Sequence, residues 1–188
     1  MSPQICRPFA VDRRGLNLGE AAAFVLLERG GSDLKLLGYG ESSDAHHMSA
    51  PHPQGLGARL AIEQALSRAG RAPHEIQYIN LHGTATPKND AVEARLVAGM
   101  FPATTRASST KGWTAHTLGA AGSLEAIITF LALRTGLIPG TLNTTQLDPG
   151  LRSADPDREL TGEVRYALSN SFGFGGSNCV LLFGREAA

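Results

Sequence analysis

The order of apolar segments along the 188 residues predicts a layered α/β fold with a mixed β-sheet. Short apolar runs of strand length alternate with longer segments in which apolar residues recur every three or four positions, as in amphipathic helices. The last two apolar runs are separated only by a glycine-rich turn, which predicts an antiparallel pair. Hydrophobic residues make up 42% and charged residues 18%, which excludes disordered, collagen-like and coiled-coil classes.

Two strands and one helix are expected in the first third of the chain. The apolar run at residues 21–28 (AAAFVLLE) is too short for a typical helix and predicts a buried strand, and residues 34–39 (LKLLGY) predict the next. After a polar loop at residues 42–48, residues 55–69 have helical periodicity, and Gly70 is a typical C-terminal stop. The apolar face of this helix consists of Leu56, Leu60, Ala61, Ala65, Leu66 and Ala69.

A third strand is expected at residues 77–81 (QYINL), and a second amphipathic helix follows it. Asn89 or Asp90 can cap the N-terminus of this helix, and Pro102 ends it. Its apolar residues are Val92, Leu96, Val97 and Met100. The polar stretch at residues 82–88 is therefore expected to be the loop between strand and helix.

The second half continues with a strand at residues 106–109, a helix at 118–135 and final strands at 166–172 and 179–184. The helix has almost no polar face, which predicts that it is buried between two layers. Its large apolar residues are Leu124, Ile127, Ile128, Phe130, Leu131 and Leu133. Residues 139–161 are rich in Pro, Thr and Asp, and are expected to form a long surface connection.

The composition limits the possible binding partners and the cellular location of the protein. The 17 basic and 17 acidic residues cancel, so the charge favours neither nucleic acid nor an anionic membrane. No apolar run reaches the roughly 20 residues that span a bilayer, and the N-terminus lacks the order of a signal peptide, so we expect a cytoplasmic location. Cys6 and Cys179 fit neither a disulfide framework nor metal-ligand spacing, and both are expected to be reduced and structural.

Three of the expected strands end in loops that carry chemically functional side chains. In open α/β sheets, pockets form beside the ends of strands, so these loops can converge if their strands are neighbours. The candidates are His82, Thr84 and Thr86 in the first loop, Lys111 and His116 in the second, and Phe174 in the glycine-rich turn at residues 173–176.

Each of these signals alone has a plain structural alternative. His82 can equally be a satisfied structural histidine, and Lys111 is more typical of a solvated surface residue. The glycine-rich turn precedes a strand rather than a helix, so it fits neither a Walker nor a dinucleotide site. His46 and His47 are adjacent and cannot easily share one metal ion, and Trp113 is more typical of a packing anchor.

Together, the motifs carry a specific resemblance. The stretches HGTATP, STKGWTAHTLGAAGSLEA and NSFGFGGSN begin at residues 82, 109 and 170. In this order they resemble the C-terminal half of the β-ketoacyl-acyl carrier protein synthases, the thiolase-like condensing enzymes of fatty acid and polyketide synthesis. The segment that precedes that half in the family is similar to Arg7-Pro8-Phe9, Asp12 to Gly15 and Gly19-Glu20. The resemblance covers residues 7–183, which is essentially the whole chain.

The resemblance implies decarboxylative condensation of acyl and malonyl thioesters, with a catalytic role for the matching residues. His82 and His116 match the family histidines that donate hydrogen bonds to the thioester oxygen while the enolate forms. For that role each imidazole must be neutral and must present an N–H group. Lys111 matches the lysine that organises the site, and Glu125 matches the carboxylate that pairs with it.

The remaining matches concern the substrate. Phe174 resembles the residue whose backbone N–H completes the oxyanion hole and whose ring gates the acyl pocket, and Thr84 and Thr86 resemble the hydroxyls that bind the phosphopantetheine arm. The resemblance implies no metal and no cofactor, because the substrates are carried on the phosphopantetheine of acyl carrier protein. Ala115 and Ala85 stand where glycine and serine or threonine are common, and both are small enough to predict tuning rather than loss.

The resemblance also implies a division of the chain and a missing nucleophile. Residues 1–32 match the end of the N-terminal thiolase-like half, including its closing strands, and residues 33–188 match the C-terminal half. The family's catalytic cysteine belongs to the preceding half, and neither Cys6 nor Cys179 matches it. We therefore expect this chain alone to be inactive, and to form a dimer or a hetero-complex with an N-terminal half or second subunit that supplies the cysteine.

Two other classes of protein compete with this interpretation. A non-catalytic partner of the chain-length-factor type would lack the cysteine, but it has no chemical need of His82, His116 and Lys111. A generic α/β binding domain would require three ordered motifs to arise by accident.

Overall fold

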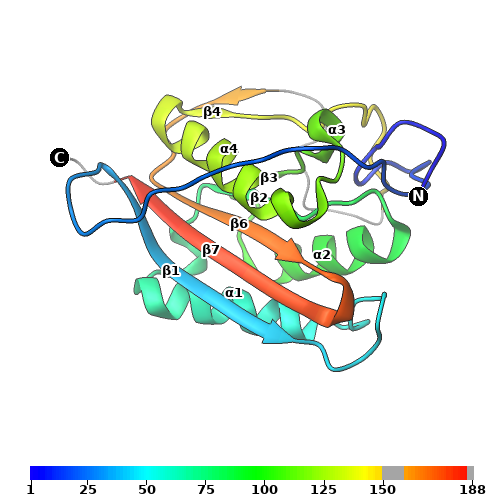
Figure 1. Cartoon of the computed structure of the whole chain (residues 1–188), viewed down its shortest axis with the longest axis horizontal. Helices are drawn as coiled ribbons and strands as arrows, with labels where there is room; N and C mark the ends of the chain where they lie inside the picture. Colours follow the sequence, from blue (N-terminus) through cyan, green and yellow to red (C-terminus); the bar gives the residue numbers. More distant parts are fainter. Residues whose placement is uncertain (150–158, 186–188) are drawn as a thin grey trace.

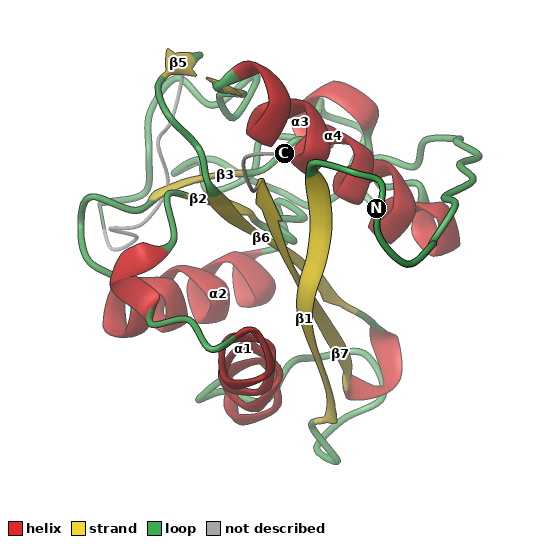
Figure 2. Ribbon diagram, turned by 90° about the vertical axis from the view of Figure 1, so that its left-hand side faces the viewer, coloured by secondary structure: helices red, strands yellow, loops and turns green. Residues whose placement is uncertain are grey.

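A computed structural model describes residues 1–149 and 159–185 and shows a mixed five-stranded sheet with helices on both faces (Figures 1 and 2). Its strands, in spatial order, are β1 (Leu34–Ser43), β7 (Ser177–Arg185), β6 (Tyr166–Phe172), β2 (Tyr78–Asn80) and β3 (Arg106–Ser108). β7 is antiparallel to both of its neighbours, whereas β2 is parallel to β3 and to β6. The predicted α/β fold, its mixed sheet and its antiparallel final pair are confirmed.

The helices form one layer on each face of the sheet. α1 (Leu56–Ala69) and α2 (Pro87–Met100) lie on one face, and α4 (Ala121–Thr135) lies on the other (Figure 2). The smaller elements are α3 (Lys111–Thr114), the 3-10 turns η1 (Pro73–Glu75), η2 (Leu118–Ala120) and η3 (Phe174–Gly176), and the antiparallel pair of β4 (Leu137–Ile138) and β5 (Leu160–Thr161). α3 and the β4–β5 pair were not expected from the sequence. Residues 150–158 of the predicted long connection lie outside the described residues.

α1 forms where it was predicted, between left-handed glycines at Gly55 and Gly70, but its buried face differs from the predicted one. Leu56 and Leu60 are half exposed, and the side chains turned inward are mostly small. The reason is the closeness of the sheet, because a Cβ atom at Gly40 of β1 would lie 1.8 Å from the carbonyl oxygen of Ala61. Small side chains of α1 must therefore face the sheet where it comes closest. The buried residues of α1 are Gly57, Ala58, Ala61, Ile62, Ala65 and Leu66.

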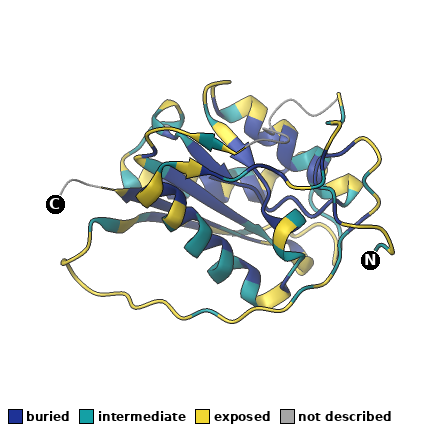
Figure 3. Ribbon diagram, turned by 90° about the horizontal axis from the view of Figure 1, so that it is seen from above, coloured by how far each residue is buried: buried dark blue, intermediate teal, exposed yellow. Residues whose placement is uncertain are grey.

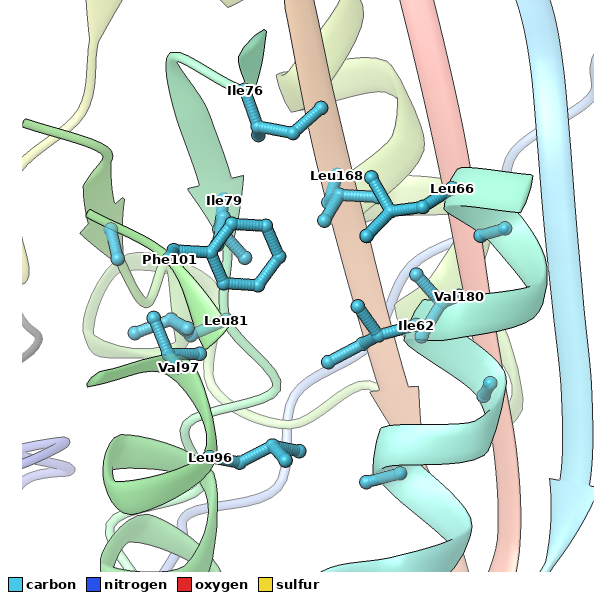
Figure 4. Close-up of a cluster of buried hydrophobic side chains, with 14 of the residues drawn as sticks. Ile62, Leu66, Ile76, Ile79, Leu81, Leu96, Val97, Phe101, Leu168 and Val180 are labelled. Carbon is cyan, nitrogen blue, oxygen red and sulfur yellow. The ribbon is translucent and has the colours of Figure 1, made fainter. Parts of the chain in front are cut away.

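Two hydrophobic clusters hold the layers together. The larger one joins α1 and α2 to the sheet, with Ile62, Ile79 and Leu168 at its centre (Figure 4). The smaller one joins α4 to the opposite face and includes Leu133 and Phe183, whose ring packs at a tilt against that of Phe130. Each face of the sheet thus has its own apolar core.

The predicted buried strand at residues 21–28 is absent from the structure. This stretch is an extended arm on the outside of the molecule (Figure 3), and the Phe24 side chain is 98% exposed. A strand requires hydrogen bonds to a neighbouring strand, and no described residue supplies them here. The prediction of a buried strand at residues 21–28 is therefore wrong for this chain.

α4 is covered on one side only, which corrects the prediction of a helix buried between layers. It contacts β6 and β7, yet Leu131 is 52% exposed on the side away from the sheet. By length and composition alone, Leu118–Thr135 is apolar enough to cross a membrane, a test that core helices of soluble proteins also pass. Because α4 packs on the sheet through Ala126, Ala132 and Leu133, the structure assigns it to the core.

The N-cap of α2 lies three residues before the first of the two predicted caps. Pro87 is its first residue and Thr86 its N-cap, so that Asn89 and Asp90 lie inside the first turn. Proline suits this position because its missing N–H would have no partner within the helix. The shift places Asp90 on the buried face, where it contributes to the site described below.

The close contact between β1 and α1 predicts a large effect of one methyl group. Gly40→Ala should lower the free energy of unfolding by about 3 kcal/mol, because the new Cβ would overlap the backbone of α1. Gly99→Ala is the matched control, since no atom lies within 4 Å of a Cβ added there in α2, and it should stabilise the protein by about 0.5 kcal/mol. Equilibrium urea unfolding measures both. Equal stability of the Gly40→Ala variant and the native protein would contradict this packing.

Candidate active site

The three candidate loops meet at one end of the sheet. β2, β3 and β6 are parallel, so the loops that follow them leave the same edge. They line a cavity of about 980 Å³ that contains all the predicted pocket residues except Lys111 and Glu125. The ring centroids of His82 and His116 lie 5.3 Å apart. The predicted convergence is therefore observed.

The turn after β2 is held by a buried carboxylate of α2. Glu93 accepts the backbone N–H groups of His82 and Gly83, both at 2.8 Å, and the side-chain amide of Asn170 on β6 at 3.1 Å. Glycine is required at Gly83 because a Cβ there would lie 2.4 Å from that of Ser109. Burial raises the pKa of Glu93 to about 7, against the opposing effect of these hydrogen bonds.

A second buried carboxylate supports the same turn. Asp90 accepts the N–H of Thr84 at 3.1 Å and the N–H of Phe9 at 2.8 Å. Burial raises the pKa of Asp90 to about 6, while its hydrogen bonds and Arg13 oppose this shift. Neither carboxylate was recognised from the sequence as part of the site. The available signal was an acidic pair three residues apart, just after a histidine-containing turn.

Lys111 is buried, so the interpretation of this residue as a solvated surface lysine is wrong. Its side chain is 1% exposed and forms an ion pair with Glu125 of α4, which is 2% exposed. The ammonium also donates to the backbone carbonyl of His82 at 2.6 Å and lies 3.4 Å from Nδ1 of that ring. Burial raises the pKa of Glu125, and the adjacent ammonium opposes the shift.

Both candidate histidines are neutral in this environment. Burial is the largest cause that lowers the pKa of His82 well below 6.5, and the charge of Lys111 adds to it. The same two causes lower the pKa of His116 to about 4. Nδ1 of His82 faces an ammonium group, which can only donate, and Nδ1 of His116 accepts the Leu118 N–H at 3.2 Å. Each ring therefore carries its proton on Nε2 and can donate one hydrogen bond.

Ala115 holds a strained backbone immediately before His116. Its φ of 56° and ψ of −172° lie in a region that is essentially restricted to glycine. Ala85 and Leu118, which flank the two histidines, also have positive φ values, of 62° and 54°. Ala115 is thus accommodated in a conformation that favours glycine, with strain in the turn.

The predicted substrate-contact residues all line the cavity. The hydroxyls of Thr84 and Thr86 are 2.8 Å apart, and both residues line the cavity. Phe174 is 75% exposed in η3, where Gly175 and Gly176 have positive φ values of 80° and 77°. The ring therefore stands at the cavity rather than in the core.

The other candidates have structural roles. Trp113 donates from Nε1 to the Gly140 carbonyl at 3.1 Å, but it is 53% exposed, so the prediction of a packing anchor is not confirmed. His46 packs edge-on against His52, and no group of metal-ligating side chains is found among residues 1–149 and 159–185.

Neither cysteine is suited to act as a nucleophile. Both are free thiols, and burial raises the pKa of Cys6 to about 11. Burial and the nearby Glu41 also raise the pKa of Cys179. Because the thiolate is the reactive form, these shifts disfavour attack by either residue.

The sequence matches the family described as "Beta-ketoacyl synthase, C-terminal domain" over residues 35–145, which is more than half of the chain. The chain belongs to the β-ketoacyl synthase family. The resemblance stated from the three motifs is confirmed, and the matched region contains His82, Lys111, His116 and Glu125.

Relatives and solved structures agree with this assignment to the ketosynthases. The chain is 45% identical to a mitochondrial 3-oxoacyl-[acyl-carrier-protein] synthase of Arabidopsis thaliana, covering 97% of this chain and 43% of that protein. It is 37% identical to 3-oxoacyl-[acyl-carrier-protein] synthase 2 of Staphylococcus aureus, over 95% of this chain and 47% of that protein.

Among solved structures, a ketosynthase in complex with its chain length factor from Xenorhabdus doucetiae is similar at 46% identity and a TM-score of 0.94, covering 99% of this chain and 47% of that one. A β-ketoacyl synthase from Burkholderia phymatum is similar at 34% identity and a TM-score of 0.90, over 96% of this chain and 46% of that one. The fold is therefore the thiolase-like ketosynthase fold. The chain spans less than half the length of each of these four relatives.

The strain at Ala115 predicts a stabilising substitution. Ala115→Gly should raise the free energy of unfolding by about 1 kcal/mol, because relief of roughly 1–3 kcal/mol of strain exceeds the entropic cost of glycine, roughly 0.5–1 kcal/mol. Ala120→Gly is the matched control, since Ala120 has an ordinary φ of −86°, and it should be destabilising. Urea unfolding of the two variants provides the comparison, and destabilisation by both would show that Ala115 is unstrained.

The lowered pKa values predict that both rings stay neutral in mildly acidic solution. Nitrogen-15 NMR of the histidine side chains should show His82 and His116 as neutral Nε2–H tautomers at pH 6. The His116 contribution to stability is fully present above the unfolded-state value of 6.5 and is lost as the pH falls from 6.5 towards 4.

His116→Gln tests the pH dependence of stability, because Glu93 and Asp90, whose pKa values are raised, give the opposite dependence. As the pH falls below 6.5, the native protein should lose stability relative to this variant. A charged His116 ring at pH 6 would contradict the prediction.

Proposed function

We propose that this chain forms the histidine-bearing part of a 3-oxoacyl-[acyl carrier protein] synthase, which condenses acyl and malonyl thioesters in fatty acid or polyketide synthesis. The observation that carries the proposal is the pair of neutral imidazoles, 5.3 Å apart, each with Nδ1 occupied and Nε2–H able to donate. Two donors of this kind can bind one thioester oxygen.

The proposed chemistry uses these donors while charge develops. When a malonyl thioester loses carbon dioxide, the C–C bond breaks and its electron pair moves towards the thioester carbonyl, which becomes an enolate. His82 and His116 would each donate a hydrogen bond to that oxygen, in a site where burial strengthens the interaction. The enolate carbon would then attack an acyl thioester, forming the new C–C bond and releasing a thiolate. In the proposal that thiolate belongs to a cysteine outside these 188 residues.

The other residues would position the substrates. Lys111, through its bond to the His82 carbonyl, would hold the first histidine, and Glu125 would hold the lysine in place. Thr84 and Thr86 would bind the phosphopantetheine arm in the cavity, and the ring of Phe174 would gate the acyl pocket. This arrangement needs no metal and no further cofactor. We propose acyl carrier protein as the partner that delivers the substrates.

The proposal includes a covering partner for the exposed apolar surfaces. Phe24 on the arm and Leu131 on α4 would be buried by an N-terminal ketosynthase half, so that residues 1–32 would complete that half. One solved relative is a ketosynthase bound to its chain length factor, which supports a second subunit. A non-catalytic partner role for this chain is disfavoured by the buried Lys111–Glu125 pair, because its burial has a cost without chemistry to serve.

The test is decarboxylation of malonyl-acyl carrier protein by the native protein that contains this chain. His82→Ala and His116→Ala should each lower kcat about 10²- to 10³-fold, the loss expected for one oxyanion donor. His74→Ala is the control, because His74 is exposed in η1 at the opposite end of β2. Unchanged turnover in the first two variants would reject the catalytic role and favour the non-catalytic partner.

A further inference from the structure

The N-terminal segment, defined as residues 1–19, has no helix and only isolated β-bridges, yet it contacts both histidine loops (Figure 1). It reaches the first loop through Phe9, whose N–H donates to Asp90 at 2.8 Å, and Asp90 in turn accepts the Thr84 N–H. The end of the segment reaches the loop that carries His116. The segment therefore runs beside the candidate site and is not a strand of the sheet.

The side chain of Asn17 binds the backbone at the start of this segment. Its side-chain oxygen accepts the Cys6 N–H at 2.6 Å, and its side-chain nitrogen donates to the carbonyls of Ser2 and Gln4, both at 3.0 Å. All three partners are backbone groups. One side chain thus fixes the main-chain path of residues 2–6.

The backbone of the same region holds His116 from both sides. The His116 N–H donates to the Asn17 carbonyl at 2.9 Å, and the His116 carbonyl accepts the Gly19 N–H at 3.1 Å. Leu18 and His116 consequently form an isolated parallel bridge. His116 lies between α3 and η2, outside any helix or strand, so this bridge determines its main-chain position.

The bridge also explains why the strain at Ala115 persists. Strained backbone conformations survive only where the surrounding structure fixes them. A Cβ atom at Gly19 would lie 2.2 Å from the Thr114 carbonyl oxygen and 3.1 Å from the Ala115 Cβ, so the segment is in backbone contact with the strained turn. If the segment moved away, Ala115 could relax and carry the His116 ring with it.

We propose that the N-terminal segment holds the His116 imidazole in its productive orientation, with Asn17 as the positioning residue and Gly19 as the point of contact. Asn17 acts through the backbone and does not touch the reacting atoms. The consequence for turnover rests on the proposed function, whereas the orientation of the ring is measurable without turnover.

The experiment compares Asn17→Ala with the native protein, labelled with nitrogen-15 histidine. The native His116 ring should give one Nε2–H tautomer, because Nδ1 accepts the Leu118 N–H. In Asn17→Ala that contact should loosen, giving mixed tautomers and a His116 pKa that moves from about 4 towards 6.5. Malonyl decarboxylation should fall about 10- to 100-fold in kcat with little change in KM, as expected for a misplaced donor.

Two further variants separate positioning from general stability. Gln77→Ala removes another amide with three backbone bonds, to Glu75, Arg165 and Tyr166, at the other end of β2. It should lower Tm comparably and leave the His116 resonances unchanged. Gly19→Ala keeps the bonds to residues 2–6 but pushes on the turn, so it should alter the same resonances as Asn17→Ala.

A rescue completes the test. In the double variant Asn17→Ala/Ala115→Gly, glycine adopts the turn without strain, so the single His116 tautomer should return at least in part. Native His116 resonances in both Asn17→Ala and Gly19→Ala would overturn the proposal, as would an equal disturbance by Gln77→Ala. If the native protein shows no decarboxylation while these resonances still respond, the proposed function fails and the positioning role stands.

Discussion

The buried ion pair between Lys111 and Glu125 is the interaction on which the site depends. Removing a charge from water costs several kcal/mol, and loss of one partner from a buried pair typically costs about 3–5 kcal/mol. The pair joins α3, which follows β3, to α4, and the same ammonium binds the His82 carbonyl just after β2. Three elements therefore meet at one cation, and their relative positions fix the first histidine. The ammonium also helps to keep both imidazoles neutral.

Close backbone approach is the second constraint, and glycine makes it possible at both histidine loops. Gly83 allows the turn after β2 to press on Ser109, and Gly19 allows the N-terminal segment to press on the turn before His116. In both places hydrogen bonds to backbone groups hold the turn, from Glu93 in the first and from the backbone bridge in the second. The histidine rings are thus oriented mainly by main-chain contacts, which short side chains in the loops leave unobstructed.

The sequence predicts the strands and loops that carry the histidines, but not the buried groups and main-chain contacts that orient the rings. The convergence of His82, His116 and Phe174 follows from parallel strands whose ends share an edge, but the sequence made it conditional on those strands being neighbours, and only the structure gives the strand order. The burial of Glu93 could not be inferred, because a periodicity analysis counts any carboxylate as solvent-facing. The failed strand around Phe24 has a different cause, since an apolar run favours extended backbone but does not supply a neighbouring strand, and no described residue pairs with it here.

The charge balance of the site indicates how it could favour a reaction rather than binding alone. Lys111 is paired with Glu125 behind the cavity wall, and both imidazoles are neutral, so these four groups together carry no net charge. A malonyl carboxylate in the ground state would gain no ion pair from them. In the proposed reaction the same carboxylate leaves as neutral carbon dioxide, and negative charge moves to the thioester oxygen between two N–H donors. Interactions that strengthen only as charge moves lower the barrier without stabilising the substrate, so a histidine kept neutral by burial is a better donor here than a charged one.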